Sequence, residues 1–237
     1  MSVETAWQAL FVHAGLSVPG VAGGESSTKD SPLTIYVTAA AGGVGVWVVQ
    51  LAKWAGARVI ASCSSSGADV VRKLGADEVV DYKSVDIQEW VATRLDTRTS
   101  HPSTTNPDPS TNADPPTHPP PAHPPADIVI DCIGRASLSS AWHVVKPGGK
   151  IISIFEPPED RRPPEVKGKE VESLFFIMKS DGEQLEKATK ELIERGGGRP
   201  AVDSVWTFEE FEGAFERSGS GRTRGKVVVD LSGEGGE

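Results

Sequence analysis

Cysteine is scarce in this 237-residue sequence, which contains only Cys63 and Cys132. Two cysteines exclude a disulfide framework and a four-cysteine zinc site, and they fit a reducing compartment. Both lie in or beside predicted strands, so we expect small, buried side chains rather than reactive thiols.

Basic residues and long apolar runs are also lacking. The chain has 24 Lys and Arg against 33 Asp and Glu, and its net charge of -9 argues against nucleic acid or an anionic membrane as a partner. No apolar run approaches the length of a membrane span. The stretch Met1–Trp7 has neither the features of a secretory signal nor the arginines of an amphipathic presequence. We therefore expect a cytoplasmic protein, with a mitochondrial location left open.

The most informative stretch is Leu33–Gly45, in which an apolar strand runs into a turn of small residues. Residues Val46–Ala55 follow at helical spacing. A strand, a glycine turn and a helix in this order form a dinucleotide pyrophosphate site, because small residues let the backbone approach the phosphates and the helix N-terminus favours negative charge. The pattern here is Ala40-x-Gly42-x-x-Gly45, with alanine in the first glycine place. Such a turn also occurs as plain packing, but the flanking strand and helix favour the cofactor interpretation.

Strand and helix patterns alternate along the rest of the chain. Predicted strands cover 33–38, 58–62, 78–81, 127–132, 150–154, 200–206 and 226–231, and predicted helices cover 4–16, 46–55, 68–74, 86–95, 136–145, 182–194 and 207–217. This order predicts an α/β fold with a doubly wound parallel Rossmann-type sheet and helices on both faces. We expect a leading helix and Gly/Ser loop (1–30), a NAD(P)-binding Rossmann domain (31–96 and 126–180), and a C-terminal helix–strand–helix–strand segment that completes the fold (181–237).

A proline-rich segment at 97–125 interrupts the predicted domain. It holds ten of the eighteen prolines and His101, His118 and His123, with almost no large apolar residue. Such a composition cannot bury enough surface to offset the entropy of ordering, so we expect a disordered insertion. The histidine spacing fits no metal-ligand pattern.

The end of the second predicted strand indicates which dinucleotide binds. Dinucleotide folds that bind NAD often place a carboxylate there, which hydrogen-bonds the ribose 2′-hydroxyl. Here the residues are Ser62-Cys-Ser-Ser-Ser-Gly67. Serine hydroxyls and free backbone N–H groups accept a 2′-phosphate, which a carboxylate would repel. The sequence therefore favours NADP(H) over NAD(H), although a Ser/Gly turn can also be only a turn.

Several motifs together resemble the medium-chain dehydrogenase/reductase superfamily, in its zinc-independent, quinone-oxidoreductase-like and enoyl-reductase-like branch. In order, they are Thr5-Ala-Trp-Gln-Ala-Leu-Phe11, Ala39-Ala-Ala-Gly-Gly-Val-Gly45, Gln50-Leu-Ala-Lys53, Leu74-Gly-Ala-Asp77, Asp127-Ile-Val-Ile-Asp131, Lys146-Pro-Gly-Gly149 and Arg224-Gly-Lys-Val-Val228. The resemblance implies hydride transfer from NADPH to a quinone, an enone or another small carbonyl compound, without zinc. It also implies a homodimer formed by edge-to-edge pairing of sheets.

The same resemblance assigns cofactor contacts to particular residues. It implies that Ala41, Gly42, Gly43, Val44 and Gly45 hold the pyrophosphate, and that Ser64, Ser65, Ser66 and Tyr82 meet the adenosine phosphate. Ile133, Gly134, Ile154, Phe155 and Phe176 would lie on the nicotinamide side, and Lys226 would be a further contact. Relatives place a basic residue a little after the second strand, where this chain has Gly67.

No catalytic acid or base can be assigned from the sequence. The resemblance implies a GroES-like catalytic domain at the start of relatives, and it aligns this sequence with the part that begins at the helix after that domain. Three interpretations result: an oxidoreductase in a truncated form with little activity alone, a non-catalytic NAD(P)-binding module or pseudoenzyme, and a methyltransferase. The last needs acidic residues at two places that hold Thr38-Ala-Ala40 and Ser62-Cys-Ser64.

Overall fold

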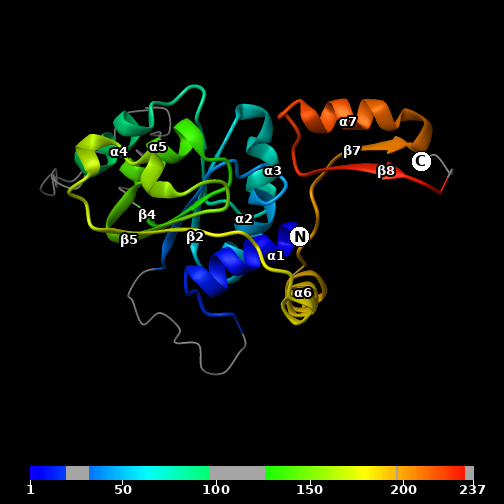
Figure 1. Cartoon of the computed structure of the whole chain (residues 1–237), viewed down its shortest axis with the longest axis horizontal. Coiled ribbons are helices and arrows are strands. Elements are labelled where there is room, and N and C mark those ends of the chain that lie inside the picture. Colours follow the sequence, from blue (N-terminus) through cyan, green and yellow to red (C-terminus); the bar gives the residue numbers. More distant parts are fainter. Residues whose placement is uncertain (20–31, 97–125, 196, 233–237) are drawn as a thin grey trace, which may run out of the picture.

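A six-stranded, wholly parallel sheet forms the centre of the molecule (Figure 1). The computed structural model describes residues 1–19, 32–96, 126–195 and 197–232. The strand order is β3-β2-β1-β4-β5-β6, so the order reverses between β1 and β4. The strands are β1 (Thr34–Val37), β2 (Arg58–Cys63), β3 (Glu78–Asp81), β4 (Ala126–Asp131), β5 (Val145–Ser153) and β6 (Val171–Phe175). The predicted parallel Rossmann-type sheet is confirmed.

Helices cover both faces of this sheet. The helices of the main body are α1 (Ser2–Trp7), α2 (Gly45–Trp54), α3 (Ala68–Lys73), α4 (Ile87–Asp96), α5 (Arg135–Val144) and α6 (Gly182–Ala188). Helix α7 (Phe211–Gly219) packs instead on the strands β7 and β8 described below. Wider π-helical turns at Gln8–His13 and Thr189–Arg195 extend α1 and α6. Short 3-10 turns occupy Ser65–Gly67, Pro158–Arg161, Pro164–Val166 and Phe208–Glu210.

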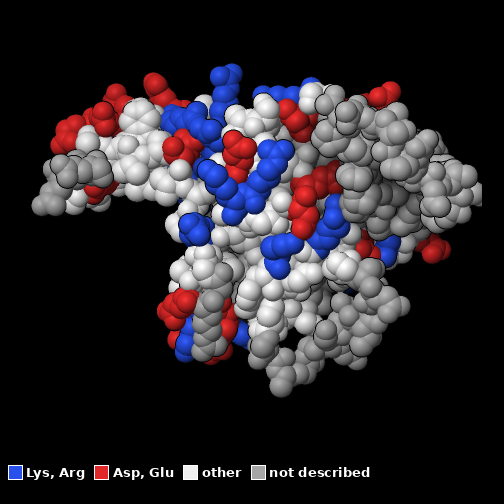
Figure 2. Space-filling view, turned by 180° about the vertical axis from the view of Figure 1, so that it is seen from behind, with Lys and Arg blue, Asp and Glu red and all other residues white. Residues whose placement is uncertain are grey.

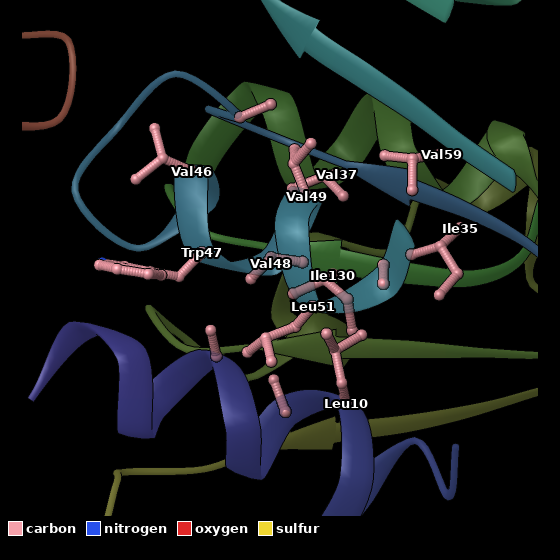
Figure 3. Close-up of a cluster of buried hydrophobic side chains, with 14 of the residues drawn as sticks. Leu10, Ile35, Val37, Val46, Trp47, Val48, Val49, Leu51, Val59 and Ile130 are labelled. Atoms are coloured by element: carbon pink, nitrogen blue, oxygen red, sulfur yellow. The ribbon is translucent and has the colours of Figure 1, made fainter. Parts of the chain in front are cut away.

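Alternate side chains of the strands enter two separate cores. Ile35 and Val37 of β1 pack with the α1 and α2 side, whereas Tyr36 between them packs with α4 and α5. This follows from the two-residue period of a strand, which sends successive side chains to opposite faces. Figure 3 shows the first core, in which Leu51 of α2 and Leu10 of the turn after α1 lie in one cluster with Ile130 of β4.

Helix α2 is buried around its whole circumference from Gly45 to Ala52, because α1 covers the side that faces away from the sheet. A helix with apolar residues on every side needs such a position. The helix that follows the glycine turn is therefore fixed at its start by packing on all sides.

The structure differs from the predicted elements at the far side of the sheet. Strand β6 was not predicted, because its five residues, Val-Glu-Ser-Leu-Phe, form neither an apolar run nor a regular alternation of apolar and polar residues. Strand β5 also begins at Val145, five residues before the predicted start of that strand at residue 150. Gly149 pairs with Val171 of β6, and Gly148 N donates to Glu170 O at 2.7 Å, so these residues join the sheet.

Two further strands form a separate parallel pair, β7 (Val202–Thr207) and β8 (Lys226–Asp230). Together with α7 they make a C-terminal lobe, residues 202–230, which stands to one side of the main body in Figure 1. The predicted strands and helix of this segment are confirmed. A capping box, in which Thr207 and Glu210 bond reciprocally, begins the turn Phe208–Glu210 that leads into α7.

Two predictions concern residues outside the described ranges. Most of the Gly/Ser loop and the whole proline-rich insertion, with His101, His118 and His123, belong there. Within the described residues, no helix has both the length and the apolar character that a membrane span requires.

Candidate functional site

The carboxyl ends of β1 and β4 define the candidate site. In an open parallel sheet, loops diverge where the strand order reverses and leave a crevice beyond the strand ends, which is where ligands bind. That reversal lies between β1 and β4 in this sheet. The loops that follow β1, β2, β4 and β5 carry most of the predicted cofactor residues.

The turn after β1 requires very small residues. Gly42 N donates to Ala39 O at 2.8 Å, and Ala39 itself has a φ of 46°, which non-glycine residues rarely adopt. A Cβ added to Gly45 would lie 2.4 Å from Ala39 O and 2.7 Å from Ala40 Cα. Helix α2 begins at Gly45, with Val44 as its N-cap, so the positive end of its helix dipole lies at this turn. The turn thus has the features of an anion cradle.

The segment Arg224–Lys226 lies directly over the glycine turn. Gly225 N donates to Ala41 O at 2.9 Å. Lys226 Nζ would be 2.7 Å from a Cβ at Gly43, so its ammonium group fills the space beside that glycine. The ammonium group also donates to Ser2 Oγ at 2.5 Å, and burial lowers its pKa. The Lys226 side chain therefore lies beside Gly43 of the glycine turn. Its role as a cofactor contact stays a prediction.

The serine loop after β2 adjoins the glycine turn. A Cβ at the buried Gly67 would lie 2.7 Å from Ala41 Cβ, which leaves no room for a larger residue. Ser64 and Ser66 hydroxyls are 3.1 Å apart, and Ser65 and Ser66 are exposed. The loop is therefore held close to the turn while its hydroxyls stay open to a ligand.

Two charged residues beside the serine loop were missed in the sequence. Arg224 Nη1 donates to Ser66 O at 3.2 Å, although 158 positions separate them. On the other side, Asp81 at the end of β3 accepts from Ser65 N at 3.1 Å and from Lys83 N at 3.0 Å. The Arg-Gly-Lys motif could have indicated Arg224. Tyr82 follows Asp81 and is 54% exposed, so its ring is open rather than packed.

A second group of predicted residues lies after β4 and β5. A Cβ at Gly134 would meet the Phe155 ring at 2.4 Å, so these two loops touch. Ile133 is 46% exposed and Phe155 is 47% exposed. Together they form an apolar surface beyond the carboxyl ends of β4 and β5. Ile154 is half-buried against the first core. Phe176 differs, because it is buried and its ring lies 4.3 Å from that of His13.

A hydrogen-bond network fixes the ends of the three central strands. Asp131 accepts from Thr38 Oγ1 at 2.7 Å and from Ser153 Oγ at 2.8 Å, which joins β4 to the ends of β1 and β5. Gly134 N also donates to this carboxylate, at 2.9 Å. Ser153 Oγ in turn accepts from Phe155 N at 3.1 Å. Loop positions after β4 and β5 are therefore set by one buried carboxylate.

Basic side chains gather where the C-terminal lobe meets the main body. A cavity of 480 Å³ lies there between α3 and the lobe, and Lys73, Arg199 and Arg224 line it with Asp203. Figure 2 shows Lys and Arg on this side of the molecule, interspersed with acidic side chains. Such a concentration of positive charge favours an anionic ligand locally, despite the net negative charge of the chain.

The described residues contain no group of three or more His, Cys, Asp or Glu side chains placed to hold a metal ion. Taken together, the described loops place four features at the carboxyl ends of the strands: the glycine turn, the cations of Lys226 and Arg224, the serine loop, and the apolar surface of Ile133 and Phe155. This combination suits an elongated ligand with several phosphates and flat rings.

Comparison with known proteins agrees with this arrangement. Residues 120–229 match the zinc-binding dehydrogenase family model. A probable mitochondrial zinc-binding oxidoreductase of Arthroderma benhamiae is 36% identical over 232 residues, which are 98% of this chain and 60% of the relative. The chain thus spans about three-fifths of that relative's length.

Solved structures show the same fold. The quinone oxidoreductase of Coxiella burnetii superposes with a TM-score of 0.70 at 22% identity, covering 98% of this chain and 58% of the other. The quinone oxidoreductase of Thermus thermophilus, also solved in complex with NADPH, gives 0.65 at 24% identity, covering 98% and 63%.

Proposed function

We propose that this chain, a member of the medium-chain dehydrogenase/reductase superfamily, binds NADP(H) and supports hydride transfer to a small enone, quinone or carbonyl compound. The observation that carries this proposal is the course of Arg224–Lys226. It brings Lys226 to the glycine turn and Arg224 to the serine loop, so that one segment supplies a cation at each predicted phosphate position.

The residues present fit a dinucleotide. Gly43, Gly45 and Gly67 lack the Cβ atoms that would meet Lys226 Nζ, Ala39 O and Ala41 Cβ at 2.7, 2.4 and 2.7 Å. Their backbone is consequently close to neighbouring groups and can approach a ligand, as pyrophosphate binding demands. Gly42 and Val44 complete the turn, and Ile133, Gly134, Ile154 and Phe155 would support the nicotinamide side.

The charge around the serine loop supports NADP(H) rather than NAD(H). Arg224 is 44% exposed and has a planar guanidinium group that can bind a phosphate at two points. Asp81 is the nearby acid, but its oxygens accept from the backbone N–H groups of Ser65 and Lys83. Asp81 therefore orients the loop, while Arg224 replaces the basic residue that Gly67 cannot supply.

When bound, NADPH would supply a hydride, and the substrate would take up one proton as well, so that a C=C, C=O or quinone is reduced as NADP⁺ forms. Ile133 and Phe155 would keep water from the ring at the sheet edge. No described side chain is assigned as the proton donor, and we propose that solvent delivers the proton. The substrate pocket and unaided activity belong to the proposal, because the chain spans only part of its relatives.

Substitution of the phosphate-binding arginine tests this proposal. In R224Q we expect NADPH affinity to fall about tenfold or more, because a charge-assisted hydrogen bond to the 2′-phosphate is lost. NADH affinity should stay unchanged. R222Q, which removes a neighbouring charge outside the site, is the matched control. Equal affinity of the wild-type chain for NADPH and NADH would contradict the NADP preference, and binding of neither would contradict the function.

A second candidate function is cofactor binding without turnover. It is favoured because no proton donor is assigned among the described loop residues. NADPH oxidation with a panel of quinones and enones separates the two candidates. Tight binding with no oxidation would establish the binding module, and oxidation above the rate without protein would establish the enzyme.

We also propose a homodimer formed through β6. This strand ends the described six-strand order, so one of its edges has no neighbour there, and Leu174 is 37% exposed. Analytical ultracentrifugation should show twice the chain mass. Cytoplasm and mitochondria are the proposed locations, the second because the fungal relative is named mitochondrial. A fluorescent fusion would distinguish them.

A further inference from the structure

Asp131 is a wholly buried carboxylate whose partners are all neutral. It is 0% exposed and accepts hydrogen bonds from two hydroxyls, those of Thr38 and Ser153, and from Gly134 N. None of its partners in the described part of the chain is Lys, Arg or His. A buried charge without a counter-charge opposes folding, because the lost hydration is not replaced by an opposite charge.

Asp203 shows how this fold compensates another buried acid. Its side chain is 1% exposed, but Arg217 holds both of its oxygens and Arg224 lies 3.6 Å away. Asp203 thus has two cations, whereas Asp131 has none. Because the fold supplies cations to Asp203 but none among the described partners of Asp131, we expect a role of the Asp131 carboxylate beyond hydrogen bonding.

The carboxylate of Asp131 lies directly beneath the loop that follows β4. Gly134 N donates to Asp131, and the next N–H, of Arg135, donates to Glu156. Both donors have positive φ, 69° at Gly134 and 56° at Arg135. An arginine in this conformation is strained, and such strain concentrates where a loop must face a ligand. Two carboxylates therefore hold one strained loop in place.

The two carboxylates differ in net charge. Glu156 accepts from Arg161 Nε and Nη2, each at 3.0 Å, and these bonds lower its pKa. The Glu156–Arg161 pair carries no net charge, and the guanidinium of Arg135 lies over the Phe155 ring, 5.6 Å from its centre. Asp131 differs from Glu156 because its hydrogen-bond partners in the described part of the chain, beneath Ile133 and Gly134, are all neutral.

We infer that Asp131 tunes the bound nicotinamide by charge as well as positioning its loop. The inference rests on the proposed function, in which Ile133 and Gly134 support that ring. The oxidised ring is a cation and the reduced ring is neutral, so a fixed negative charge stabilises NADP⁺ relative to NADPH. The protein would thereby favour release of the hydride to substrate.

The isosteric change D131N tests the inference by binding rather than by activity. Dissociation constants of NADP⁺ and NADPH are measured by calorimetry for the wild-type 237-residue chain and for each variant. In D131N the ratio Kd(NADP⁺)/Kd(NADPH) should rise roughly tenfold, as Coulomb attraction through a partly screened interior implies. A ratio that stays unchanged in a folded D131N protein overturns the inference.

Two controls separate charge from structure. S153A removes one hydrogen bond and keeps the charge, and D203N removes a buried carboxylate from the C-terminal lobe. Both should leave the ratio unchanged even where they weaken binding of both forms. If D131N does not fold, the wild-type ratio decides, because a protein that binds NADPH far more tightly than NADP⁺ contradicts the inference. Failure of the wild-type chain to bind either form would instead refute the proposed function.

Discussion

Arg217 and Asp203 form a two-point ion pair inside the C-terminal lobe, with Nε–Oδ2 at 2.6 Å and Nη2–Oδ1 at 2.7 Å. It joins α7 to β7, and the same carboxylate accepts from Arg224 N at 3.0 Å. Since Arg224 contacts the serine loop, the ion pair connects the stability of the lobe to the candidate cofactor site.

Loss of this ion pair should destabilise the protein. R217Q leaves the buried Asp203 with Arg224 as its remaining cation, so we expect the free energy of unfolding to fall by about 2 kcal/mol, less than for a fully orphaned charge. Urea denaturation measures this change. R222Q on the same segment should stay within about 0.5 kcal/mol of wild type, because its side chain makes none of these contacts. Equal stability of R217Q and R222Q would contradict the prediction.

The contribution of Asp203 should also depend on pH. Its hydrogen bonds with Arg217 hold the pKa of the carboxyl well below its usual range. A depressed folded-state pKa stabilises the protein above the unfolded value, about 3.9, and this stabilisation is lost as the pH falls towards the folded value. The stability difference between wild type and D203N should therefore be constant near neutrality and shrink below about pH 4.

Gly45 should not tolerate even one methyl group. In G45A the new Cβ would lie 2.4 Å from Ala39 O, a backbone atom that can move only by opening the turn. We expect a loss of about 1–3 kcal/mol in stability and at least a tenfold loss of cofactor affinity, since the turn positions the first N–H groups of α2. G168A is the control, because a Cβ at Gly168 would meet no atom within 4 Å. Both are measured by thermal melting and cofactor titration.

Lys226 and Arg224 should have separable effects on cofactor choice. K226M removes the cation beside Gly43, so NADPH and NADH should both bind about tenfold more weakly, because both contain the pyrophosphate. R224Q should weaken NADPH binding alone. K150M, at a lysine paired with Glu172 3.1 Å away in the sheet, serves as the control. A cofactor-specific effect of K226M would place its ammonium group elsewhere.

Both thiols should be inert in the folded protein. Burial raises the pKa of Cys63 to about 11 and also raises that of Cys132, with nearby Asp81 and Asp131 adding to the respective effects. At pH 8 about one Cys63 in a thousand would be thiolate. A disulfide-exchange reagent should titrate no thiol within minutes in buffer and two in denaturant. Rapid reaction of one thiol in buffer would contradict this packing.

The local parts of the fold could be read from the sequence, and the long-range contacts could not. Strands β1, β2 and β4 are apolar runs, and the turn at Gly42–Gly45 needs small residues, so each is encoded within a few neighbouring positions. The contact between Arg224 and Ser66 depends on the path of the C-terminal segment, which no local pattern encodes.

Strand β6 and the hydrogen-bond partners of Asp131 were also difficult to predict from the sequence, for a related reason. Strand β6 lies at one end of the six-strand order, and its short sequence has neither the apolar run nor the regular alternation that predicts a strand. Asp131 was predicted to lie within the strand 127–132, but its partners Thr38 and Ser153 become neighbours only when β1, β4 and β5 align.

The hydrogen bond between Lys226 and Ser2 joins residues 224 positions apart beside the glycine turn. A dinucleotide bound there would contact a lysine that is already connected to α1, so occupancy would restrain both segments at once. At a ligand concentration one hundred times Kd, binding stabilises a protein by about 2.7 kcal/mol. Amide hydrogen exchange should therefore slow together in α1 and β8 on titration with NADPH, which makes these distant segments a joint reporter of ligation.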